Sequence, residues 1–181
     1  MEESTNADQE ALQRKLDLYL NELRLLAKPL SAELRQKISD ELLARLALSL
    51  LNETVFAIVN GLMEIQHVTE SQLEQQRMAL TKQHRFEKSR LAEALKKSSE
   101  SSEIKKRRTD ELERSHTEAL KELDISILGQ FDHKVADQQC TLELAGVPGF
   151  FVTTNPVDVQ AQMHLLDFII QLSVLKPNST V

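Results

Sequence analysis

The sequence is short of the residues that build compact, loop-rich folds. Only 4% of its residues are aromatic, tryptophan is absent, and glycine and proline occur four times each. A catalytic domain ordinarily needs aromatic side chains in its core and glycine-rich loops around its cleft, so this composition argues against a compact enzyme. It suits long helices that bury a narrow apolar seam, and we expect an all-α protein.

Cysteine and long apolar runs are scarce as well. The single cysteine, Cys140, excludes an intramolecular disulfide and a cysteine-based metal cage. We expect its thiol to be buried and inert, because no pair of cationic neighbours adjoins it. The sequence has no run of about 18 apolar residues, and its polar start is unlike a secretory signal. We therefore expect an intracellular protein without membrane insertion.

The motifs of the common enzyme classes are missing too. No GxGxxG, GxxxxGK[ST], HExxH or GxSxG is present, which removes the minimal geometry for nucleotide, metalloprotease and hydrolase chemistry. The histidines lack the spacing of metal ligands, so we expect most of them on solvated faces or seam edges of helices. They are His67, His84, His116, His133 and His164. We predict no catalytic residue, no cofactor and no metal.

Charge is distributed unevenly along the chain. The net charge is −6, yet the segment from Lys96 to Arg108 holds six basic and two acidic residues. Because the rest of the chain is acidic, we do not expect direct binding to nucleic acid. The cluster Lys105, Lys106, Arg107 and Arg108 has two readings. It is either a nuclear import signal at an exposed tip or a solvated basic helix face.

Apolar spacing and capping residues divide the N-terminal part of the chain into helices. Apolar side chains recur every three or four residues in a first helix, expected from about Ala7 to Ala27 and ended by Pro29. Ser31 is placed to cap a short second helix. Ser39 or Asp40 is placed to cap a third, whose leucines form a wide apolar face.

Two long helices are predicted in the middle of the chain. The first spans Thr54 to Lys97, and its apolar surface narrows to a single stripe along its length. A polar tip near residues 98–108 separates it from a second, expected to start at Thr109 and end near Ala145. Such a pair favours an antiparallel coiled-coil hairpin, with a continuous rod as the competing arrangement. We expect an elongated protein, with short flanking helices packed at the base of the hairpin.

A short corner joins the second long helix to the last one. Gly146 can take the left-handed conformation that closes a helix, and Pro148 cannot continue that helix. Asn155 offers a side-chain oxygen to the first free amides of the last helix, and Pro156 has the φ that its first turn needs. Asp158 is placed at the third helical position to answer Asn155.

Three strongly apolar residues, Phe150, Phe151 and Val152, lie in this corner. The loop is too short to bury them by itself, so they either complete the core or offer an interaction surface. In chain order, the sequence divides into an N-terminal helical segment (1–53), the coiled-coil hairpin (54–146), and the corner loop with the C-terminal helix (147–181).

Two stretches resemble a known family. LALSLLNETVFAIVNGLMEIQHVTESQL, from Leu46 to Leu73, and KVADQQCTLELAGVPGFFVTTNP, from Lys134 to Pro156, are similar to the gonadal protein gdl family, which includes the DiGeorge syndrome critical region proteins of vertebrates. The chain resembles the insect gdl members most, over roughly Leu46 to Leu172. The tip between Ala94 and Arg108 departs from the family pattern. The family carries no catalytic motif that could be transferred to this numbering.

These observations lead to an expected function. We predict a non-enzymatic coiled-coil scaffold or adaptor that binds protein partner helices or associates with itself. The resemblance implies a role in gonads, gametogenesis or development, and a place in the nucleus or cytoplasm with the nucleus favoured. The alternative is a nuclear regulatory factor associated with nucleic-acid complexes, whose binding would weaken steeply with salt.

Overall fold

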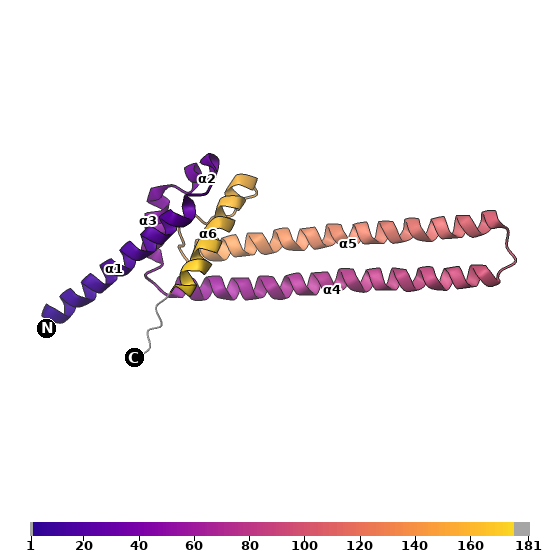
Figure 1. Cartoon of the computed structure of the whole chain (residues 1–181), viewed down its shortest axis with the longest axis horizontal. Coiled ribbons are helices and arrows are strands. Elements are labelled where there is room, and N and C mark those ends of the chain that lie inside the picture. The colour runs from indigo at the N-terminus through magenta and orange to yellow at the C-terminus, as the bar shows by residue number, and fades with distance from the viewer. Residues whose placement is uncertain (1, 176–181) are drawn as a thin grey trace. The chain divides into compact units, whose positions relative to one another are not determined.

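The computed structural model describes residues 2–175, with side chains from Ala7 onward, and every regular element in this range is a helix (Figure 1). The helices are α1 (Glu2–Ala27), α2 (Ala32–Lys37), α3 (Asp40–Ser49), α4 (Thr54–Lys97), α5 (Ser102–Leu144) and α6 (Pro156–Val174). The all-α prediction and the pair of long helices are confirmed. The end of the predicted C-terminal segment, residues 176–181, lies outside the described range.

By packing, the chain divides into two compact units. Unit 1 contains Met1–Glu64 and Val135–Val181, and unit 2 contains Ile65–Lys134. The first turns of α4 and the last turns of α5 therefore belong to unit 1, together with the short helices. The rest of these two helices makes up unit 2.

Unit 1 is built around one apolar core. α1 packs against α3 and α6, and α2 also contacts α6. The most completely buried side chains come from these helices and from the adjoining ends of α4 and α5. They are Leu23, Leu46, Leu50, Val59, Leu142, Leu165, Ile169 and Leu172. Tyr19 of α1 also meets Phe56 of α4 edge to face, with 6.0 Å between the ring centroids. The short helices thus pack at the base of the hairpin.

The predicted helix caps in the N-terminal part are present. The hydroxyl of Ser31 accepts a hydrogen bond from the amide of Leu34 at the start of α2. The hydroxyl of Ser39 does the same for Leu42 at the start of α3. Each bond satisfies an amide that has no partner within its own helix, which is why serine at this position starts a helix.

Unit 2 is an antiparallel pair formed by α4 and α5 (Figure 1). Arg77 of α4 donates two hydrogen bonds to the carboxylate of Asp124 of α5, at 2.8 and 3.3 Å. Nearer the turn, Lys88 Nζ lies 2.7 Å from Glu113 Oε1. Partners on α5 move toward its N-terminus as those on α4 move toward its C-terminus, so the hairpin is confirmed.

The turn of the hairpin is shorter than predicted. α5 begins at Ser102 and not at Thr109, so only residues 98–101 lie outside the two helices. The hydroxyl of Ser101 accepts a hydrogen bond from the amide of Ile104 and caps α5. Thr109 lies inside α5, where its hydroxyl donates to the carbonyl of Lys105, so it does not start a helix.

Among the described residues, no single helix has both the length and the hydropathy to cross a bilayer; α3 and α4 reach them only when taken together, across a 97° bend.

Candidate functional site

The corner between α5 and α6 is closed by a helix end of the expected kind. Gly146 has φ of +71°, and its amide donates to the carbonyl of Glu143. The amide of Val147 donates to the carbonyl of Leu142, and both of these apolar side chains are buried. This is a Schellman motif, in which the left-handed residue turns the chain back over the last helical turn. It confirms the predicted end of α5.

The start of α6 is capped as predicted, with one difference. The side-chain oxygen of Asn155 accepts hydrogen bonds from the amides of Val157 and Asp158. The amide of Asn155 donates to the hydroxyl of Thr153, not to Asp158 as expected. The carboxylate of Asp158 instead lies 2.8 Å from Lys37 Nζ and links α6 to α2.

Two buried glutamines hold the backbone of the corner loop. Gln139 of α5 donates its Nε2 to the carbonyl of Thr153 at 3.2 Å and accepts the Thr153 amide on Oε1 at 3.1 Å. Gln162 of α6 donates its Nε2 to the carbonyl of Phe151 at 2.9 Å. Both side chains are only 4% exposed. Because an extended loop lacks internal partners for its polar groups, these bonds fix its path.

The fixed loop separates the three apolar residues of the corner. Phe150 is 6% exposed and belongs to the core of unit 1. Phe151 is 45% exposed and Val152 is 55% exposed. Phe150 is therefore part of the core. Phe151 and Val152 lie at the surface, on a loop whose backbone is hydrogen-bonded by Gln139 and Gln162.

A second notable feature is a pair of stacked histidines in unit 2. The rings of His84 from α4 and His116 from α5 lie 3.9 Å apart between centroids, with an interplanar angle of 5°. Each is only 8% exposed, so both occupy positions in the hairpin seam where apolar residues are usual. These two are the exceptions to the expectation that most histidines lie on solvated faces or at seam edges.

Glu87 orients the histidine pair. Because a carboxylate only accepts hydrogen bonds, His116 Nε2 must donate to Glu87 Oε2, at 2.7 Å. Hydrogen bonds from Gln83 and His116 lower the pKa of Glu87 below its ordinary value. Burial lowers the pKa of His84, the adjacent His116 lowers it further, and the charge of Glu87 opposes both effects. The surroundings thus favour a neutral His84 ring.

A shallow hollow of about 460 Å³ lies over the pair, between α4 and α5. Arg85, Lys88 and Glu113 line it along with the two histidines. Within the described residues, no group hydrogen-bonds His84 Nδ1. The same part of the chain contains no group of three or more histidine, cysteine or acidic side chains arranged to hold a metal ion.

The predicted basic cluster lies in the first turns of α5. Lys105 Nζ donates to the carbonyl of Ser98 at 2.8 Å, and Arg108 binds the carboxylate of Glu100 at 3.0 and 3.2 Å. Two of the four cations are therefore tied to the turn of the hairpin.

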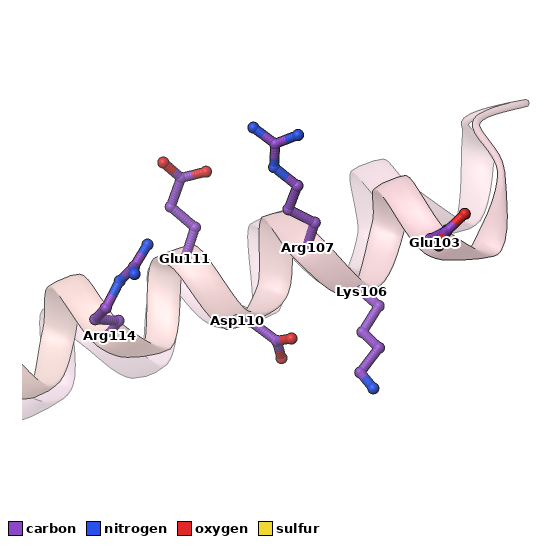
Figure 2. A pocket seen from close by; sticks show the side chains of 6 residues that line it. All are labelled: Glu103, Lys106, Arg107, Asp110, Glu111 and Arg114. Carbon is purple, nitrogen blue, oxygen red and sulfur yellow. The ribbon is translucent and has the colours of Figure 1, made fainter.

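Lys106 and Arg107, the other two cations of the cluster, are exposed near the start of α5. Figure 2 shows them alternating with Glu103, Asp110 and Glu111 along this one helix. Opposite charges three or four residues apart are neighbours on a helix and support it in water. The surface has mixed charge and is not a uniformly basic face.

Cys140 is exposed, so the expectation of a buried thiol is wrong. The reason is its neighbour Gln139, which takes the inward position to bind the corner loop. One step along a helix turns a side chain by about 100°, which carries Cys140 away from that contact.

Sequence reasoning missed the histidine pair and both glutamines. A signal for the pair exists, because His84 continues the spacing of the α4 leucines, and folding the chain back at the tip brings residue 116 opposite it. The glutamines have no comparable signal, since each binds backbone groups whose position depends on the corner loop.

Fold and site together define a class: an all-helical protein with a two-helix hairpin, a helical core and a clamped corner. The family model for the DiGeorge syndrome critical region 6 (DGCR6) protein matches residues 1–180, and the chain belongs to this family.

Two curated relatives illustrate this membership. The chain is 41% identical over 167 residues to "Gonadal protein gdl" of Drosophila melanogaster, an overlap that covers 92% of this chain and 84% of the relative. It is 40% identical over 162 residues to "Protein DGCR6" of Gallus gallus, covering 84% and 81% respectively. No solved structure matches the chain.

Proposed function

We propose that this protein is a non-enzymatic scaffold, and that the surface formed by Phe151 and Val152 binds a helix of another protein. The observation that supports it most is the combination of exposure and fixed backbone at this corner. Both side chains are about half exposed, yet two buried glutamines hold the loop. A preorganised apolar surface loses little conformational entropy when a partner binds, which favours recognition.

The names of the relatives agree with a non-catalytic role, because neither is the name of an enzyme. "Gonadal protein gdl" refers to the gonad, and we propose that this chain acts in gonads, gametogenesis or development. We expect it to work inside the cell, in the nucleus or the cytoplasm.

Affinity purification from gonadal tissue tests the scaffold function. Wild-type chain should capture protein partners that are lost with Phe151→Ser combined with Val152→Ser. Phe150 is left intact in this experiment, because it is part of the core and its replacement would destabilise unit 1. Leu25→Ser is the matched control, since Leu25 is 51% exposed on α1. Equal capture by all three proteins would refute the proposed surface.

A nuclear regulatory factor is the second candidate, and the cluster from Lys105 to Arg108 is the observation that favours it. A fluorescent reporter carrying residues 94–110 should then concentrate in the nucleus, and replacing Lys106 and Arg107 with glutamine should abolish this. An evenly distributed reporter would remove the import signal. Salt-dependent binding of the full chain to nucleic acid would favour this candidate over the scaffold.

A further inference from the structure

α5 carries a second apolar surface, outside the hairpin seam. Ile125 is 60% exposed and Leu128 is 63% exposed. They lie three residues apart, so they are neighbours on one face of the helix. Leu123 and Ile127 of the seam are less exposed. Two large apolar side chains are therefore neighbours on the solvent-exposed side of α5.

One basic and one acidic residue flank Ile125 and Leu128 on the same face of α5. Lys121 lies four residues before Ile125, and Asp132 lies four residues after Leu128. The spacing of four, three and four residues repeats the pattern of a coiled-coil seam. Both charged side chains are exposed, and neither forms an ion pair within the part of the chain that the structure describes. We call Lys121, Ile125, Leu128 and Asp132 the outer face of α5.

The outer face is complementary to itself in one orientation. In an antiparallel pair related by a twofold axis between Ile125 and Leu128, each Ile125 lies opposite Leu128 of the second copy. The same symmetry places each Lys121 opposite Asp132 of the second copy. Because a twofold interface contains every contact twice, it has four central apolar side chains flanked by two ion pairs.

The charges also select against the parallel orientation. There, Lys121 would face Lys121 and Asp132 would face Asp132, and like charges across an interface are unfavourable. Other exposed apolar residues of unit 2 lack this arrangement. Met78, for example, lies on α4 among Glu74, Arg77, Lys82 and Arg85, and no apolar residue lies three or four positions from it in the direction of either helix end.

We propose that the protein forms a homodimer in which the outer faces of two α5 helices pack antiparallel. The inference rests on the proposed scaffold function and deepens it, because it names a second copy of this chain as one partner and a surface distinct from the corner. Two copies joined in this way present two corners, so the scaffold is bivalent.

Charge exchange in the full-length chain tests the proposal. Lys121→Asp places two like-charged pairs in the dimer, as does Asp132→Lys, and each should weaken the dimer about tenfold or more. The double variant restores opposite charges and should return the dissociation constant to near that of the wild type. Glu122→Lys is the matched control, an exposed residue of α5 outside the outer face, and should leave the dimer unchanged. Light scattering after size exclusion, across a concentration series, gives the mass of each protein.

Several results would overturn the dimer. The wild-type chain could stay monomeric, or the single variants could dimerise as well as the wild type. The double variant could also fail to recover the dissociation constant of the wild type. A Glu122→Lys variant as weak as Asp132→Lys would also do so, since the effect would then reflect net charge. A monomeric wild type that still captures partners through Phe151 and Val152 would refute the dimer and leave the scaffold function standing.

Discussion

Replacing Gly149 with alanine should destabilise unit 1 through two separate effects. Gly149 has φ of +89°, a backbone conformation that residues with a Cβ atom adopt at a cost. It also lies close to side chains of both α3 and α6. A Cβ atom placed on it would be 2.6 Å from Leu165 Cδ1 of α6 and 3.3 Å from Leu42 Cδ2 of α3. Leu165 is only 1% exposed, so it has little room to move away.

The two effects can be given rough magnitudes. A left-handed backbone costs a residue other than glycine about 1–2 kcal/mol. Forcing an extra carbon into a packed core typically costs about 1–3 kcal/mol. We therefore expect Gly149→Ala to lower the free energy of unfolding by about 2–5 kcal/mol, which is a large share of the stability of an ordinary domain.

The chain provides controls that separate these effects, measured by urea denaturation followed by circular dichroism. Gly146 has a positive φ, but a Cβ atom there would meet nothing within 4 Å, so Gly146→Ala should show the backbone cost alone. Gly61 lies inside α4 with equally open surroundings, and Gly61→Ala should stabilise by about 0.5–1 kcal/mol. If Gly149→Ala cost no more than Gly146→Ala, the close approach of Leu42 and Leu165 would be refuted.

Three further predictions follow from the buried polar groups and the divided corner. The folded-state pKa of His84 lies below its ordinary value of 6.5, so protons bind the unfolded chain first. Thermal stability should therefore be full above about pH 6.5 and fall as the pH drops below it, and His84→Phe should remove this loss; an unchanged profile would contradict the assignment. Gln139→Leu leaves the amide and carbonyl of Thr153 without their partner and should cost about 1–3 kcal/mol in urea denaturation; an unchanged stability would mean that these two bonds do not hold the loop. Phe150→Ala should cost about 3–5 kcal/mol, whereas Phe151→Ala should change stability by less than about 0.5 kcal/mol; equal costs would mean that the corner does not divide them.

The helix boundaries could largely be predicted from the sequence, because they depend on residues close together in the chain. Ser31 and Ser39 each cap a helix through an amide three residues later, and Gly146 closes α5 through carbonyls within one turn. The start of α5 could not be predicted in the same way, because Ser101 and Thr109 are both acceptable caps by local chemistry and the structure uses Ser101. With α5 beginning at Ser102, Lys105 and Arg108 contact Ser98 and Glu100 of the turn.

The candidate site could be predicted only in outline. Its location in the corner followed from the unusual run of Phe150, Phe151 and Val152, but their division between core and surface did not. That division depends on Gln139 and Gln162, which come from different helices and bind the loop backbone.

The all-helical class, the two long helices and the corner between α5 and α6 could be predicted from the sequence, since apolar spacing and capping act over three or four residues. The choice of a hairpin over a continuous rod came from the contacts between α4 and α5. Only the tertiary structure brought His84 against His116, set Gly149 between Leu42 and Leu165, and left Phe151 in water. These features depend on residues that lie far apart along the chain. Such contacts join residues on separate helices, and their geometry is decided by how whole helices pack and not by any local pattern.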